Sequence, residues 1–62
     1  MRLFLQDAVH TESLASFLRS VGQTPVLVGP DALDVDVEPA ELEVYLRVWQ
    51  VLHPDADVTM QA

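Results

Sequence analysis

The chain has 62 residues, a net charge of −7 and no cysteine, and together these exclude several classes of protein. There is room for one domain, over residues 1–62, and a domain of this size buries only about 60% of its unfolded surface. Disulfides, thiolate metal sites and Cys-x-x-Cys redox motifs are excluded, so oligomerisation is the expected source of extra stability. Half of the residues are hydrophobic, and we expect some of them to contact a partner.

The charged residues are strongly biased toward acids, with ten Asp and Glu against three arginines and no lysine. Binding to a phosphate backbone needs clustered Lys and Arg, so we expect no nucleic acid and no anionic membrane as partner. The apolar run 3–5 is too short for a secretory signal, and no run approaches the ~20 residues of a membrane span. The expected location is the cytoplasm, which suits a chain without cysteine.

In chain order, the first predicted elements are a short strand over 2–6, a loop, and a helix over 11–21. The hydroxyl of Thr11 is predicted to cap this helix, and Gly22 is suited to a left-handed C-terminal cap. The apolar residues of the helix recur at the spacing of a single helical face, namely Leu14, Phe17, Leu18 and Val21.

The middle of the chain predicts a hairpin. A β-branched stretch over 24–28 forms the second strand, and the turn residues Gly29, Pro30 and Asp31 follow it. Over 33–37 apolar and acidic residues alternate, which predicts a third strand with one dry and one solvated face. We expect Asp34 and Asp36 to face solvent and the three apolar residues between and beside them to point inward, namely Leu33, Val35 and Val37.

A second helix is predicted from Pro39 to Leu52 or His53, because proline is favoured at the first helical position and Pro54 ends the helix. A weaker strand over 57–62 completes the order β-α-β-β-α(-β). This order predicts an α+β fold of the split βαβ, ferredoxin-like type, with two layers. Right-handed crossovers place both helices on one face of an antiparallel sheet. The predicted core contains Leu3, Leu5, Leu14, Phe17, Leu18, Leu27, Val35, Leu42, Leu46 and Trp49.

The second helix is the most informative segment because it carries two apolar stripes. One stripe contains Leu42, Tyr45, Leu46, Trp49 and His53. The other lies roughly opposite and contains Val44, Val48 and Val51. Exposed valines are also compatible with ordinary scatter on a protein surface, but their regular spacing favours an interface. Glu43 precedes Arg47 by four residues, which predicts an ion pair. The predicted protein interface is Val44, Arg47, Val48 and Val51.

For the other candidate residues, we expect structural rather than functional roles. Asp34, Asp36 and Glu38 would lie ~7 Å apart along one strand face, too widely spaced for one metal ion. The two histidines, His10 and His53, lack metal-ligand spacing, and we expect structural or capping roles for both. No nucleophile elbow surrounds the helical serines, which are Ser13, Ser16 and Ser20. We therefore predict no catalytic, cofactor or metal site.

The leading interpretation is a non-catalytic, acidic interaction module that forms a homodimer or docks on a protein partner. The alternative is a small-molecule-sensing regulatory domain with its ligand site at a subunit interface. A third interpretation is an acidic inhibitor that mimics nucleic acid, which would need its carboxylates clustered on one surface. An enzyme is the class least favoured by the sequence.

Overall fold

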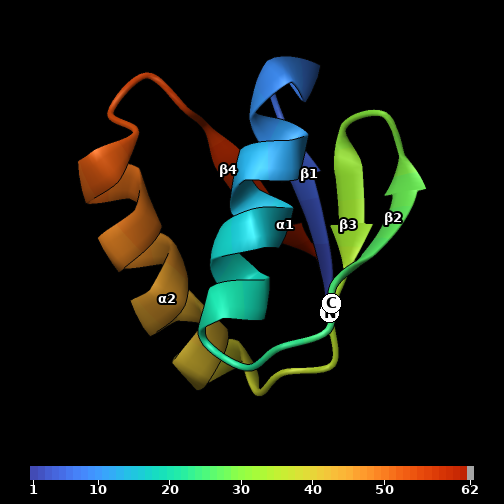
Figure 1. Cartoon of the computed structure of the whole chain (residues 1–62), viewed down its shortest axis with the longest axis vertical. Coiled ribbons are helices and arrows are strands. Elements are labelled where there is room, and N and C mark those ends of the chain that lie inside the picture. Colours follow the sequence, from blue (N-terminus) through green and yellow to red (C-terminus); the bar gives the residue numbers. More distant parts are fainter. Residues whose placement is uncertain (62) are drawn as a thin grey trace.

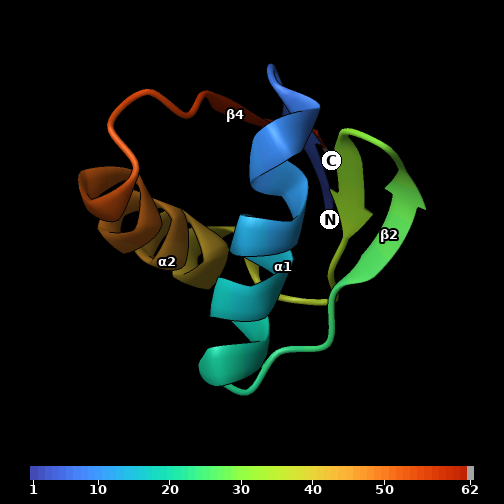
Figure 2. The same ribbon diagram turned by 45° about the horizontal axis from the view of Figure 1, so that its top comes forward.

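The computed structural model describes residues 1–61, and over that range the chain is an α+β fold with an antiparallel sheet and two α-helices (Figure 1). The elements are β1 (Arg2–Leu5), a 3₁₀ turn η1 (Ala8–His10), α1 (Thr11–Ser20), β2 (Val26–Gly29), β3 (Ala32–Asp34), α2 (Pro39–Leu52) and β4 (Val58–Gln61). Both helices lie on the same side of the sheet (Figure 2). The predicted α+β class is confirmed. Ala62, the end of the last predicted strand, lies outside the described residues.

The strand order of the sheet is β2-β3-β1-β4, and every neighbouring pair is antiparallel. Leu3 of β1 lies directly opposite Leu33 of β3, which in turn lies opposite Leu27 of β2. Direct cross-strand partners share a face of the sheet, so all three leucines point to the helix side. The opposite face carries Arg2 and Asp34, which are also paired in register. The described strands at the two edges are β2 and β4.

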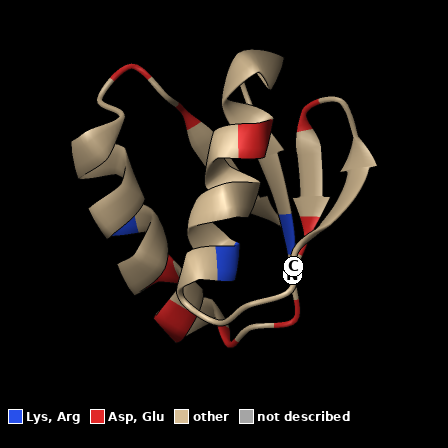
Figure 3. Cartoon of the chain, in the orientation of Figure 1, with Lys and Arg blue, Asp and Glu red and all other residues tan. Residues whose placement is uncertain are grey.

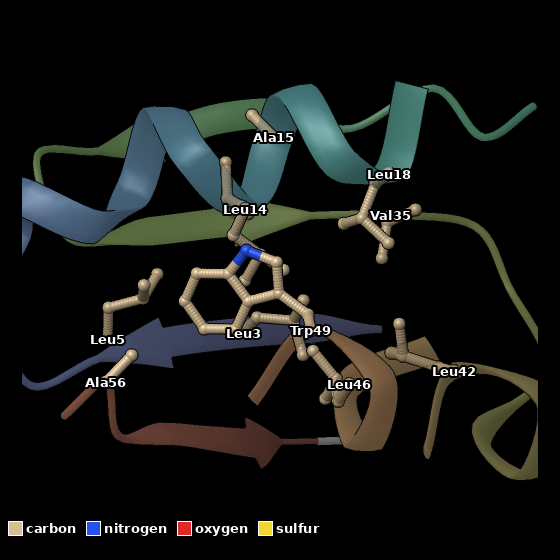
Figure 4. Packing of buried hydrophobic residues seen from close by; sticks show 11 residues of the cluster. Leu3, Leu5, Leu14, Ala15, Leu18, Val35, Leu42, Leu46, Trp49 and Ala56 are labelled. Carbon is tan, nitrogen blue, oxygen red and sulfur yellow. The ribbon is translucent and has the colours of Figure 1, made fainter. Parts of the chain in front are cut away.

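The core lies between the helices and the central strands, with the indole of Trp49 in its middle (Figure 4). Most of the predicted core is buried, but Phe17 is only half-buried and the prediction for Leu27 is wrong, because its side chain is 42% exposed. The physical reason is that Leu27 belongs to an edge strand, and β2 extends beyond α1 at the right of Figure 1. The buried core contains Leu3, Leu5, Leu14, Ala15, Leu18, Leu33, Val35, Leu42, Leu46, Trp49 and Ala56.

The start of α1 differs from the prediction, while its end agrees. Thr11 does not cap the helix but is its first residue, and its buried hydroxyl donates a hydrogen bond to the Pro30 carbonyl at 2.9 Å. The N-cap position of α1 is His10, whose side chain makes no capping hydrogen bond, whereas Asp7 caps the preceding turn η1 by accepting a hydrogen bond from the Val9 amide. At the other end, Gly22 has a φ of +88°, and its amide donates to the Arg19 carbonyl, as in a Schellman motif.

The third strand is shorter than predicted, because β3 ends at Asp34. On the β1 side, the Val35 amide still donates a hydrogen bond to the Met1 carbonyl at 2.9 Å. On the β2 side, the register ends at Val26 and Asp34, so Val35 has no strand partner on that side of the described sheet. The residue of the β2 chain that would lie opposite Val35 is Pro25, which has no N–H to donate and cannot extend the ladder. The inward residues are as predicted: Leu33 and Val35 are buried and Val37 is partly buried. Asp36 is exposed and Asp34 is half-exposed.

Candidate interaction surface on the last helix

The helix α2 is positioned by signals at both of its ends. Glu38 is extended, with φ −56° and ψ 135°, and Pro39 begins the helix where a missing N–H has no consequence. At the other end, the His53 amide donates to the Trp49 and Gln50 carbonyls before Pro54 ends the helix. Three side chains of one face, Leu42, Leu46 and Trp49, are buried against the sheet and α1 (Figure 4). This face alone is sufficient to attach the helix to the domain.

The opposite face of α2 presents apolar side chains to solvent. Val44, Val48 and Val51, which we call the valine stripe, are 56%, 51% and 78% exposed. Leu52 is also exposed and extends the stripe, because it follows Val48 by four residues and therefore shares its face. The sequence prediction omitted Leu52, although the spacing was sufficient to find it. The valine stripe has no partner within residues 1–61, so its apolar surface is available for one.

Polar pairs border the valine stripe on each side. Arg47 lies 3.4 Å from the Glu43 carboxylate, as the spacing predicts, and both side chains are exposed, so the ion pair is worth at most ~0.5 kcal/mol. On the other border the Tyr45 hydroxyl donates to Glu41 at 2.9 Å. This hydrogen bond to a carboxylate raises the pKa of Tyr45 above its ordinary value, and partial desolvation acts in the same direction. The stripe is therefore an apolar strip with a charged rim.

A groove of ≈ 260 Å³ lies next to the Arg47 side of the stripe, between α2 and β4. Its apolar part comes from Leu46, Val58 and Met60, and its rim carries Glu43 and Arg47. A hydrogen bond of 3.1 Å from the Gln50 amide to the Ala56 carbonyl fixes the helix to the segment that leads into β4. The groove thus combines an apolar floor with one charge of each sign at its edge.

The structure brings the two histidines together around Trp49, although sequence spacing indicates only that Trp49 and His53 share a face of the second helix. The His53 ring stacks on the indole at 4.6 Å with an angle of 21°, and His10 meets the same indole edge to face at 6.2 Å. The two imidazole centroids are 6.2 Å apart. We call these residues the histidine cluster. His10 and His53 are 43 positions apart in the sequence, so no local spacing could indicate their contact.

Ser13 joins the histidine cluster through a hydrogen bond of 3.1 Å between its hydroxyl and Nε2 of His53. The other ring nitrogen, Nδ1, lies 3.2 Å from the Trp49 carbonyl oxygen, which only accepts. A proton on Nδ1 satisfies that carbonyl, so Nε2 is left to accept the proton of the Ser13 hydroxyl. The contact orients a hydroxyl toward an imidazole, but a carbonyl on Nδ1 cannot stabilise an imidazolium as a carboxylate would. Its role is to join α1 to the end of α2.

The indole nitrogen of Trp49 is buried and has no hydrogen-bond partner among residues 1–61. In Figure 4 this nitrogen is directed toward α1. A buried donor without a partner typically destabilises a fold by ~1–3 kcal/mol, which the packing of so large a side chain offsets.

The acidic residues of the third predicted strand do not converge. Asp34 lies on the open face of the sheet, 3.8 Å from the Arg2 guanidinium, while Asp36 and Glu38 are exposed in the segment that leads to α2. Across the described chain, no group of three or more His, Asp or Glu side chains is placed to hold a metal ion. Among residues 1–61, neither α1 nor α2 has the length and hydrophobicity of a membrane-spanning helix.

No protein-family model matches the chain, no curated protein matches its sequence, and no solved structure matches its fold.

Proposed function

We propose that this protein is a small, non-catalytic interaction module that pairs with a second copy of itself through the valine stripe. The observation that carries the proposal is the exposure of Val44, Val48 and Val51 on a helix whose opposite face already fills the core. We further infer a ferredoxin-like fold, which the order of the elements and the strand order β2-β3-β1-β4 support. The lack of cysteine supports a reducing compartment such as the cytoplasm.

A second copy is the favoured partner because the stripe is short, narrow and self-complementary. Two α2 helices that cross near Val48 around a two-fold axis would remove both stripes from water. On the rim, Arg47 of each copy would lie at the edge of the contact, where an ion pair with an acid of the other copy would be exposed and would add specificity rather than affinity. The apolar centre supplies the affinity, as burial of apolar surface is worth roughly 25 cal/mol per Å² before the losses of association.

The dependence on salt separates self-association from docking on a basic protein. Each copy carries a net charge of −7, so two copies repel each other. Salt screens exposed charges over a Debye length of about 10 Å at 0.1 M. We therefore expect added salt to strengthen the association of two copies, whereas it would weaken attraction to a cationic partner.

The deciding experiment compares wild type, Val48→Glu and the control Val9→Glu by sedimentation equilibrium. Val9 is 72% exposed in η1, outside helix α2, so its replacement makes the same change of charge at a position that is not part of the stripe. We expect wild type and Val9→Glu to associate through the stripe, whereas Val48→Glu stays folded and no longer associates through this surface. Equal association of the two variants would contradict the role of the stripe, and so would a wild-type monomer at high concentration.

The groove between α2 and β4 favours one alternative, a regulatory domain that senses a small molecule beside a subunit interface. Its apolar floor and its two opposite charges suit a small amphipathic or zwitterionic ligand. Thermal melting in the presence of a panel of metabolites and metal ions tests this function, because a ligand that binds the native state raises Tm. The Arg47→Gln variant, which removes one rim charge, should abolish any shift that depends on this groove.

A further inference from the structure

A second surface of the molecule, the edge strand β2, also lacks a partner. Val26, Leu27 and Val28 are all exposed, and within the described sheet β2 is hydrogen-bonded to β3 alone. We propose that β2 pairs antiparallel with β2 of a second copy and so continues the sheet from one copy into the next. This inference shares with the proposed function only the idea that the partner is a second copy.

The strand β2 lacks the charged side chains that usually prevent an exposed edge from pairing with another chain. Exposed edges are usually protected by charged side chains or by proline within the strand, since their free N–H and C=O groups accept any extended chain. The segment 20–30 contains no charged residue, although the chain carries ten acids and three arginines (Figure 3). The other described edge differs, because the outward residues of β4 are the polar Thr59 and Gln61 and Asp57 precedes the strand.

Two prolines limit the length of the proposed pairing. Pro25 precedes β2 and Pro30 follows it, and neither can donate a backbone hydrogen bond. Only the segment Val26–Gly29 can therefore form a ladder, and an identical segment related by a two-fold axis matches it in length. A bulge between Leu27 and Gly29 distorts the inner ladder with β3, so we expect the outer pairing to be short.

Charge favours a second copy as the occupant of this edge. Two acidic molecules repel least where they meet through their uncharged segments, and β2 is the strand that brings no charge to the contact (Figure 3). A basic partner would find no charge to pair with on β2 and would bind the acidic surfaces instead. In Figure 1 α2 and β2 lie on opposite sides of the molecule, so pairing at both surfaces would join copies into an open chain.

The test uses Val26→Lys, with Val26→Thr as the matched control. Val26 lies opposite Asp34 in register, so a lysine there gains an oppositely charged neighbour and the monomer should stay folded. The lysine also makes the net charge less negative, so any loss of association cannot come from stronger overall repulsion. Threonine keeps the β-branched shape without charge, and we expect Val26→Thr to associate as wild type does.

Sedimentation of wild type, Val26→Lys, Val48→Glu and the double variant separates the two surfaces. If both are used, wild type forms species larger than a dimer, each single variant stops at the dimer, and the double variant is a monomer. If β2 alone is used, Val48→Glu stays a dimer and Val26→Lys becomes a monomer, so the proposed function fails while this inference stands. An unchanged mass for Val26→Lys, or a wild-type monomer, overturns the pairing of β2.

Discussion

Two leucines that lie directly opposite each other, Leu27 and Leu33, should differ sharply in their effect on stability when each is replaced by alanine. Both belong to the same hairpin and point to the same side of the sheet. Leu33 is fully buried, whereas Leu27 keeps 42% of its surface exposed. The pair therefore measures how far the helices cover the sheet, with the chemistry of the substitution held constant.

The magnitudes follow from burial. Leu33→Ala removes buried methyl groups and leaves a cavity, which typically destabilises by ~2–5 kcal/mol. Leu27→Ala loses only the contacts of a half-covered side chain at an edge open to water, about 1 kcal/mol from the transfer term alone. The free energy of unfolding of a domain of this length is ~3–9 kcal/mol, at ~0.05–0.15 kcal/mol per residue. We therefore expect Leu33→Ala to be largely unfolded or barely stable, and Leu27→Ala to remain folded.

Urea denaturation followed by far-UV circular dichroism is the assay, with thermal melts as a second measurement. In a domain of this size each kcal/mol lowers Tm by about 4–8 °C, so the two variants are readily resolved. Midpoints should be measured at several protein concentrations, because pairing of β2 would add an intermolecular contribution for Leu27. Equal destabilisation of the two variants at low concentration would refute the exposure of Leu27 and the position of β2 beyond α1.

Three further expectations test individual features. Gly22→Ala should lower stability by ~1–2 kcal/mol, because φ is +88° there and no atom crowds the position, and a urea midpoint unchanged from wild type would refute the left-handed cap. Thr11→Val keeps the buried shape but removes the hydrogen bond to Pro30, so we expect a loss of about 1 kcal/mol, which a Thr11→Ser variant should partly restore. Tyr45 should ionise at a pH above its ordinary range in an ultraviolet titration, and Glu41→Gln should lower that pH. Because the folded-state pKa of Tyr45 is raised, its contribution to stability is complete at neutral pH and is lost as the pH rises through that value.

The local elements of the fold were predictable because each has a local cause. The apolar spacing of α1, the proline at the start of α2 and the left-handed Gly22 act within a few residues, and all three hold in the structure. The valine stripe of α2 is also readable from sequence, since helical periodicity alone separates it from the face of Leu42. The order of the elements was sufficient to predict an antiparallel sheet with two helices on one side.

Tertiary structure alone decided which apolar residues the helices cover and which polar groups meet. Leu27 and Leu33 both belong to strands of the predicted hairpin, but one lies in an edge strand and the other in an inner strand of the sheet. Likewise, a hydroxyl at the start of a helix predicts a cap, yet Thr11 bonds to Pro30, 19 positions away. The contact of His10 with His53 depends on how α1 and α2 pack. Sequence periodicity fixes which face of its helix or strand a residue occupies. Whether that residue is buried depends on where a helix distant in the sequence lies over the sheet.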